Sequence, residues 1–280
     1  MTLIRMAPLW LSLALLPWSS ACRMEDFVDT ARTDGYDLSG SDIDDAFIER
    51  LSLEVDGQRL EAAFARQPEP GAPVLLFCHG AAENLQRAWP KVQALYALGY
   101  QVLIFDYRGF GASGGDGFSD ASLERDALAA FDFLVTTEGV EPSRVVVYGE
   151  SMGGSAAARV ALEGGPGGLI LAATFTSLAE QLESNTHFEV PGSFVSDLEL
   201  DTRAKLGAMG GFPKLIVHGD RDRTWPPWNA RALFDAAPPA RTLSICEGCD
   251  HRDLLQRDGP WLLGSICDAG LPMAPGRCGG

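Results

Sequence analysis

Hydrophobic positions along the chain fall into short continuous runs separated by longer stretches of mixed character. Such runs are typical of strands buried on both faces of a parallel sheet. They lie at residues 74–78, 102–105, 145–148, 169–172, 215–217 and 243–246. The stretches between them predict helices at 89–98, 120–137, 152–162 and 228–236, with a closing helix over 258–267. This alternation predicts an α/β fold, with a mostly parallel sheet that helices cover on both faces.

Two segments before these runs have a different pattern. Residues 51–55 and 59–65 alternate apolar and polar positions around Asp56-Gly57, a dipeptide typical of a tight hairpin turn. They add an antiparallel hairpin, so that we expect eight strands in all. The longest connection, 173–212, separates the sixth and seventh strands and carries several apolar side chains, where we expect a lid or a pocket wall. These are Phe175, Phe188, Val190, Pro191, Phe194 and Val195.

Length and charge narrow the class of protein. The chain has 280 residues, of which 46% are hydrophobic, and a length below about 300 residues favours a single domain with a sizeable core. Its 22 Lys and Arg against 38 Asp and Glu give a formal charge of −16. Because nucleic-acid binding needs Lys and Arg to displace counterions from phosphates, we expect no nucleic-acid partner.

The N-terminus has the features of an export signal. Arg5 is followed by an apolar run over 7–17, too short to span a bilayer, and then by small residues before Cys22. This junction resembles the lipobox of bacterial lipoproteins, in which cleavage leaves a diacylated cysteine. Ser19 stands where that motif usually has Leu, so an unlipidated secreted protein stays open. We assign 1–21 to a signal peptide and expect an exported protein, anchored to a membrane through Cys22 or otherwise secreted.

An acidic segment follows the export signal. Residues 25–49 contain nine acidic side chains and one basic one, Arg32. Self-repelling charge with few apolar anchors does not offset the entropy of ordering. We therefore expect a mobile tether over 22–50 and a folded domain over 51–280.

The strongest chemical signal is Gly149-Glu150-Ser151-Met152-Gly153, at the point where the fifth strand ends and a helix begins. In this context G-x-S-x-G forms a sharp turn that lifts the serine hydroxyl above the sheet, and the following helix directs its N-terminal amides to the same point. Ser151 is therefore the candidate nucleophile. The alternative is a glycine-rich turn with an incidental serine.

A serine nucleophile needs an imidazole base and a carboxylate that orients the imidazole. The chain order nucleophile, acid, base selects His251, which follows the eighth strand, although a surface-loop histidine is the alternative. The acid should follow the seventh strand, where Asp220 and Asp222 are available. We favour Asp222, because Asp220 is better placed to brace the turn, while Asp222 could instead pair with a neighbouring arginine.

An oxyanion intermediate needs two backbone amide donors. Met152, directly after the nucleophile, supplies one, and Ala81, in the loop after the third strand, supplies the other. We expect His79 to hold that loop by hydrogen bonding rather than to act in catalysis.

Together these motifs resemble the α/β-hydrolases, specifically the compact group without a large cap that includes membrane-associated eukaryotic serine hydrolases and bacterial relatives. The matching pieces are His79-Gly80, Asp106-Tyr107-Arg108-Gly109-Phe110-Gly111-Ala112-Ser113-Gly114, the Ser151 motif, Phe175-Thr176-Ser177-Leu178, His218-Gly219-Asp220-Arg221-Asp222 and His251. The resemblance implies a cofactor-independent and metal-independent hydrolase of esters or thioesters, acting on a small-molecule or lipid-like acyl substrate. It also implies that Asp106 and Arg108 tie the loop beside the nucleophile.

Two departures from that family bear on the site. Ala81 stands where the loop usually carries Asn, which keeps the amide donor but removes a side-chain brace. Trp225-Pro226-Pro227 replaces a common Val-Pro, and Trp225 is a candidate pocket residue. A serine peptidase and a non-catalytic relative that binds acyl chains or a partner remain the alternatives.

The chain contains six cysteines, and Cys22 directly follows the predicted signal peptide. We expect Cys78 to be an inert core thiol, because it lies in an apolar strand. In an exported protein the last four, Cys246, Cys249, Cys267 and Cys278, are expected to form two disulfides that fasten the tail near the base-bearing loop. A zinc site at the C-x-x-C pair is the alternative.

Overall fold

The computed structural model describes residues 30–184, 198–257 and 259–278. Its core is one sheet with the strand order β1-β2-β4-β3-β5-β6-β7-β8. The strands are β1 (Ile48–Val55), β2 (Gln58–Ala65), β3 (Val74–Cys78), β4 (Gln101–Phe105), β5 (Val145–Glu150), β6 (Gly168–Ala172), β7 (Lys214–Gly219) and β8 (Arg241–Cys246). β2 pairs antiparallel with β1 and β4, and the other pairs are parallel. The eight-stranded, mostly parallel sheet is therefore confirmed.

Helices connect the parallel strands. They are α1 (Leu85–Ala97), α2 (Asp120–Asp132), α3 (Gly153–Gly164), α4 (Leu178–Ser184), α5 (Thr202–Gly207), α6 (Trp228–Ala236), α7 (Leu254–Arg257) and α8 (Gly259–Asp268), with short turns η2 (Asp45–Phe47), η3 (Phe133–Thr137) and η4 (Pro142–Arg144). α1 begins four residues before its predicted start, because the Asn84 side chain accepts a hydrogen bond from the Arg87 amide and caps it there. The predicted helix over 120–137 changes to a π-helical turn after Asp132.

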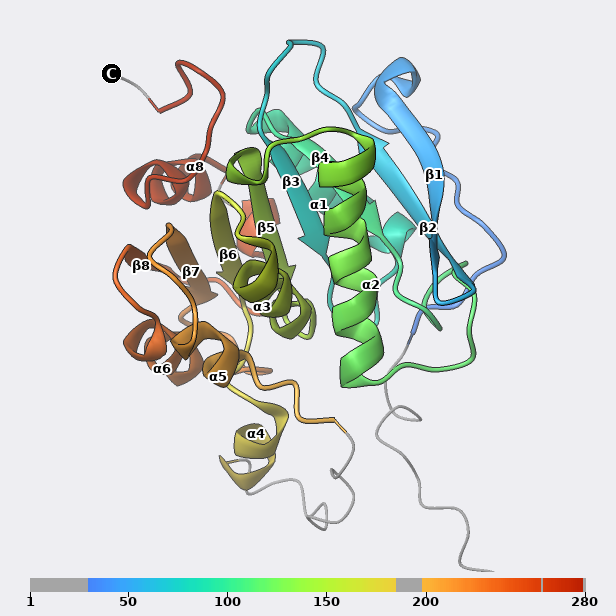
Figure 1. Cartoon of the computed structure of the whole chain (residues 1–280). Helices are drawn as coiled ribbons and strands as arrows, with labels where there is room; N and C mark the ends of the chain where they lie inside the picture. Colours follow the sequence, from blue (N-terminus) through green and yellow to red (C-terminus); the bar gives the residue numbers. More distant parts are fainter. Residues whose placement is uncertain (1–29, 185–197, 258, 279–280) are drawn as a thin grey trace, which may run out of the picture.

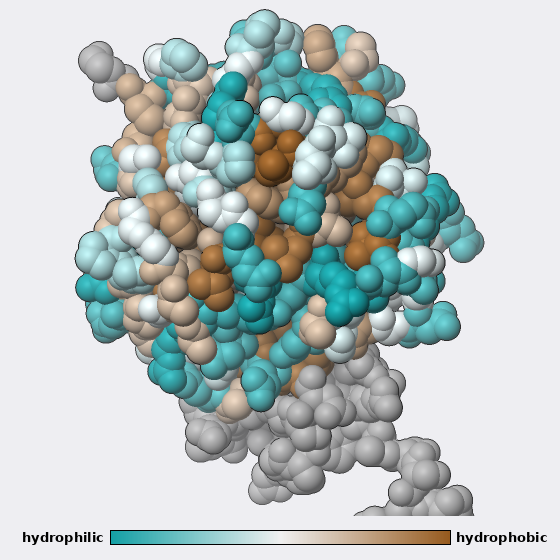
Figure 2. Space-filling model, viewed as in Figure 1, coloured by the Kyte–Doolittle hydropathy of each residue, from teal (hydrophilic) through white to brown (hydrophobic). Residues whose placement is uncertain are grey.

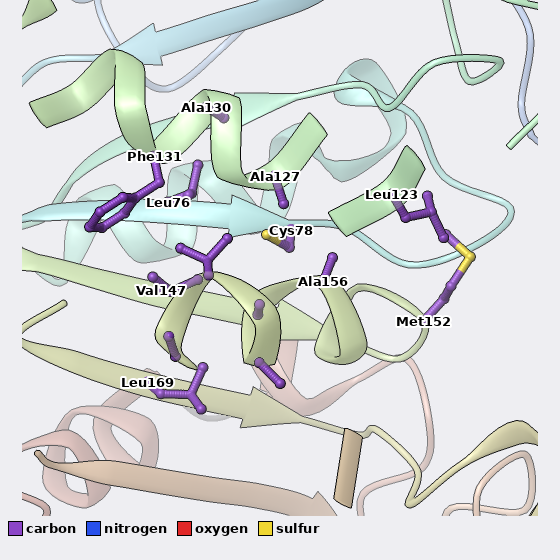
Figure 3. Close-up of a cluster of buried hydrophobic side chains, with 14 of the residues drawn as sticks. Leu76, Cys78, Leu123, Ala127, Ala130, Phe131, Val147, Met152, Ala156 and Leu169 are labelled. Carbon is purple, nitrogen blue, oxygen red and sulfur yellow. The ribbon is translucent and has the colours of Figure 1, made fainter. Parts of the chain in front are cut away.

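The helices bury both faces of the sheet (Figure 1). One apolar cluster packs α2, α3, α5 and α6 against one face, and a second packs α1, α7 and α8 against the other. Figure 3 shows part of the first cluster, where α2 and α3 side chains cover Leu76 and Cys78 of β3. Cys78 is a buried free thiol, as predicted, and burial raises its pKa to about 12.

The outer surface in Figure 2 is mixed, with hydrophilic residues surrounding scattered apolar ones. Within the described ranges the exposed large hydrophobic side chain is Trp228, at 38%. No helix in those ranges is both long enough and apolar enough to cross a bilayer.

The acidic N-terminal segment departs from its prediction. Ala31, Leu38 and Ile43 are only 3–4% exposed, and the Asn84 side chain donates a 2.7 Å hydrogen bond to the Ala31 carbonyl. A mobile tether is therefore wrong from Ala31 onward, because a few widely spaced apolar side chains anchor the segment to the domain. The predicted signal peptide and residues 22–29 lie outside the described residues.

Two disulfides join the last four cysteines, as the sequence predicts, but their placement differs from the prediction. Cys246 pairs with Cys249 at the end of β8, and Cys267 pairs with Cys278. Each bond closes a local loop, so neither fastens the tail to the base-bearing loop. The four thiols are thus committed to disulfides in this structure rather than to a metal.

Candidate active site

Ser151 occupies a sharp turn between β5 and α3. Its φ of 53° lies in the left-handed region, which costs energy for a residue with a side chain. The turn closes only because the neighbouring positions lack side chains: a Cβ at Gly153 would lie 2.1 Å from the Cys78 carbonyl oxygen, and one at Gly149 would lie 2.5 Å from Cβ of Ala157. A Cβ at Gly80 would lie 3.2 Å from Cβ of Ser151, so the loop after β3 lies directly against the serine.

The two predicted oxyanion donors flank this turn. Met152 caps α3, and its side chain, 5% exposed, lies beside Leu123 of α2, which fixes the backbone after Ser151 (Figure 3). Ala81 lies next to Gly80 in the loop that contacts Ser151. Among the described residues, neither amide donates a hydrogen bond to another backbone or side-chain acceptor, so both are available to a ligand.

The predicted acid and base are in contact. His251 Nδ1 lies 2.8 Å from Asp222 Oδ2, which places the proton on Nδ1 and leaves Nε2 as an acceptor. The Asp222 side chain is fully buried, and its Oδ1 accepts hydrogen bonds from the amides of Thr224 and Trp225. Burial would raise the pKa of Asp222, but hydrogen bonds from His218 and His251 outweigh burial and hold it well below its usual value.

The loops that carry the acid and the base are tied together. The amides of Asp220 and Arg221 donate to the carbonyls of Cys246 and Cys249, and the Asp220 side chain accepts a 2.6 Å hydrogen bond from Gly248. Asp220 therefore braces the neighbouring turn, and it does not contact His251. The Cys246–Cys249 disulfide closes that turn directly before the base.

Ser151 and His251 line one cavity of about 530 Å³, together with Gly80, Ala81 and Trp225. The Trp225 indole donates a 3.1 Å hydrogen bond to Ser151 Oγ and packs against Phe175, with ring centroids 4.5 Å apart. The expectation that Trp225 lines the pocket is confirmed. Of the long connection, Phe175 is buried, whereas Phe188, Val190, Pro191, Phe194 and Val195 lie outside the described residues.

A charged cluster in the cavity wall was missed in the sequence. The Lys91 ammonium binds the carboxylates of Glu150 and Glu83, and all three residues line the cavity. Burial raises the pKa of the Glu150 carboxyl, which Lys91 opposes. Lys91 lies in a predicted helix, and a lysine in such a helix is usually expected to be exposed to solvent. The helical spacing that directs it toward the sheet is the signal that could have found it.

The loop after β4 supports the site from a distance. Arg108 pairs with Asp126 at 2.6 Å rather than with Asp106, whose Oδ1 instead accepts a hydrogen bond from the Leu85 amide. Each of the two residues therefore ties the loop to a neighbouring helix, Arg108 to α2 and Asp106 to α1, in agreement with the scaffold role that the resemblance implies. His79 Nδ1 lies 2.8 Å from the Gly80 carbonyl and its ring is fully buried, which fits the expected structural role.

Comparison with known proteins gives both a family and a fold. The family model described as serine aminopeptidase, S33 (Hydrolase_4), matches residues 69–208. An uncharacterized protein of Mycobacterium tuberculosis is 32% identical over 75% of this chain and 74% of its own length. Protein bem46 of Schizosaccharomyces pombe is 29% identical over 75% of this chain and 73% of its own length. The lysophosphatidylserine lipase ABHD12 of Xenopus tropicalis is 30% identical over 61% of this chain and 48% of its own length.

Solved structures agree on the fold. Est1E of Butyrivibrio proteoclasticus, solved with ferulic acid, superposes with a TM-score of 0.64 at 19% identity and covers 78% of this chain and 99% of its own. A serine hydrolase without a lid from Xanthomonas campestris gives 0.59 at 19% identity, covering 81% of this chain and 97% of its own. The chain therefore belongs to the α/β-hydrolases, in the family that the serine aminopeptidase (S33) model describes.

Proposed function

We propose that this hydrolase cleaves carboxylic esters or thioesters by acyl transfer through Ser151. The observation that carries the proposal is the contact between His251 Nδ1 and Asp222 Oδ2, 2.8 Å, at the edge of the same cavity that Ser151 lines. Ser151 and His251 line that cavity from separate loops, and Asp222 holds the imidazole from behind, which supports a Ser-His-Asp triad.

In the proposed mechanism His251 Nε2 takes the Ser151 proton as the hydroxyl attacks the substrate carbonyl. Asp222 holds the ring in the required tautomer and stabilises the imidazolium that forms. The Met152 and Ala81 amides bind the oxyanion, and His251 returns the proton to the leaving group. Water, activated by the same imidazole, then hydrolyses the acyl-enzyme and releases the acid.

The test uses the purified full chain and a Ser151→Ala variant. We expect a fluorophosphonate probe to label the wild type at Ser151, and the variant to lose labelling and on the order of a millionfold in kcat toward esters. Aryl esters and acyl thioesters of increasing chain length, compared by kcat/KM, would identify the preferred acyl group. Hydrolysis that survives at full rate in Ser151→Ala would refute the assignment.

A serine aminopeptidase is the second candidate, because the matching family model carries that description. A site for a substrate α-amine needs an available carboxylate. Glu83 and Glu150 line the cavity, but both already bind Lys91. We therefore favour esters, and aminoacyl anilides turned over faster than the matched esters would reverse that preference. Absence of any Ser151-dependent adduct would instead favour a non-catalytic binding protein.

We also propose that the protein is exported and acylated at Cys22. The two disulfides support an oxidising compartment, since such bonds persist mainly outside the cytosol. Metabolic labelling with a fatty-acid analogue tests this proposal. We expect label in the wild type, none in Cys22→Ala, and unchanged label in a Cys78→Ala control.

A further inference from the structure

A second cavity, of about 440 Å³, adjoins the candidate active site. Three arginines line it, Arg221, Arg223 and Arg252, and we call it the arginine cavity. His251 and Arg252 line both this cavity and the larger one that contains Ser151. The two cavities therefore meet at the proposed catalytic base.

These three exposed arginines differ in their pairing from several other arginines of the chain. Elsewhere Arg66, Arg108 and Arg159 each pair with two carboxylates, as expected in a protein with 38 acidic residues. In contrast, among the described residues no carboxylate or carbonyl accepts a hydrogen bond from the guanidinium groups that line the arginine cavity.

Two carboxylates in the same lining accept hydrogen bonds from backbone amides of their own loop. Asp250 Oδ1 accepts a hydrogen bond from the Arg252 amide, and Asp253 Oδ1 accepts one from the Asp250 amide. These bonds hold the backbone that carries His251. Within the described residues neither carboxylate forms an ion pair with a lining guanidinium group, and the lining carries three positive side chains against these two negative ones. Clustered guanidinium groups in a cavity attract oxyanions, which they bind through paired hydrogen bonds.

The position of the arginine cavity indicates which part of a substrate would reach it. In acyl transfer the base returns its proton to the leaving oxygen or sulfur, so the leaving group lies against the imidazole. The arginine cavity includes His251 but neither Ser151 nor the Gly80-Ala81 loop that holds the oxyanion. It therefore extends from the leaving-group side of the site.

We propose that the arginine cavity binds an anionic group, a phosphate or a carboxylate, on the leaving alcohol or thiol of the substrate. This inference rests on the proposed function, because His251 defines the leaving-group side. It narrows the substrate class to acyl esters whose leaving group carries a negative charge. The guanidinium groups offset the repulsion that an anionic substrate meets from a chain of charge −16.

The test compares butyryl esters that differ only at the far end of the alcohol: hydroxypropyl phosphate, hydroxybutyrate and butanol. We expect kcat/KM for at least one anionic ester to exceed that of the neutral ester by about tenfold, the effect of one charge-assisted hydrogen bond. The larger of the two anionic preferences identifies the headgroup. Added sodium chloride should reduce the preference by screening.

Variants test whether the preference for anionic esters comes from the arginine cavity. Arg223→Gln combined with Arg252→Gln should bring the ratio of anionic to neutral kcat/KM close to one. The matched control is Arg231→Gln, an exposed arginine on α6 that lines neither cavity, and it should keep the wild-type ratio. A wild-type ratio near one, or a ratio that survives in the double variant, would overturn the proposal.

A binding measurement distinguishes failure of the proposed ester hydrolysis from failure of the anion site. If the full chain hydrolyses no ester, calorimetric binding of hydroxypropyl phosphate tests the arginine cavity without catalysis. Binding by the wild type and the Arg231→Gln control, but not by the double variant, supports the anion site. No binding to the wild type, or equal binding to all three, overturns it.

Discussion

Replacing Asp222 by Asn tests the role of the carboxylate with almost no change in shape. Oδ1 of Asp222 accepts hydrogen bonds from the amides of Thr224 and Trp225, at 2.9 and 2.8 Å. In Asp222→Asn the carbonyl oxygen must keep that position, because an amide nitrogen there would face two donors. The new NH₂ group then points at His251 Nδ1, where Oδ2 stood.

The consequence is a reversed hydrogen bond. The ring must accept at Nδ1 and carry its proton on Nε2, so it can no longer take a proton from Ser151. Loss of the correct tautomer in a serine triad costs about 10⁴-fold in kcat, or about 5.5 kcal/mol of transition-state stabilisation. We expect a loss of that size, with KM changed far less, because the cavity that binds the substrate keeps its shape.

The assay is steady-state hydrolysis of a neutral aryl butyrate by the full chain, with thermal unfolding to show that the variant is folded. The matched control is Asp220→Asn in the same loop. Asp220 accepts one hydrogen bond from Gly248, which an Asn oxygen can also accept, so activity should stay within a few-fold of wild type. Activity of Asp222→Asn within tenfold of wild type would refute the tautomer argument.

Three further changes test the scaffold. Gly153→Ala puts a Cβ 2.1 Å from the carbonyl oxygen that ends β3, and it should lower the free energy of unfolding by about 3 kcal/mol in urea titrations. Burial raises the pKa of Asp106 to about 7, so the folded state holds a proton that the unfolded state loses near pH 4, and wild-type stability should fall as pH rises through this window. Asp106→Asn has no titrating group at this position and serves as the reference. Between about pH 5 and about pH 8, the free energy of unfolding of the wild type should fall by about 3 kcal/mol more than that of the variant, and stability curves that run parallel would contradict the prediction. Replacing Cys267 and Cys278 by Ser opens a loop with a sequence separation of 11 and should cost about 3 kcal/mol by unfolded-state entropy, measured in the same titration.

Sequence reasoning located the sheet and the chemistry because both depend on local patterns. The apolar runs fall on the observed strands with bounds shifted by at most three residues. The glycines around Ser151 predict a sharp turn, because a Cβ at those positions would clash. The order of Ser151, Asp222 and His251 along the chain selected three loops, and the structure places these loops beside one cavity. Their catalytic roles stay predictions until the variants are measured.

The remaining features depend on tertiary contacts that local patterns do not show. Acidic composition predicted a mobile segment, yet Ala31, Leu38 and Ile43 are buried, and Leu38 and Ile43 belong to the apolar cluster that includes α1. The predicted helix over 89–98 contains Lys91, but the local pattern does not show that its ammonium binds Glu150, which is distant in the sequence. Composition averages over a segment, whereas a single well-placed apolar side chain or ion pair decides how that segment packs.

The docked N-terminal segment limits how far an acylated form can stand from a membrane. Ala31 is held by Asn84, which follows Ala82 and Glu83 at the edge of the cavity. Ala31 is nine Cα-to-Cα steps (31 − 22) from Cys22, and a fully extended chain of that length reaches about 30 Å. In the lipid-anchored form, the entrance to the site would therefore stay within roughly one domain diameter of the headgroups, where amphiphilic esters concentrate.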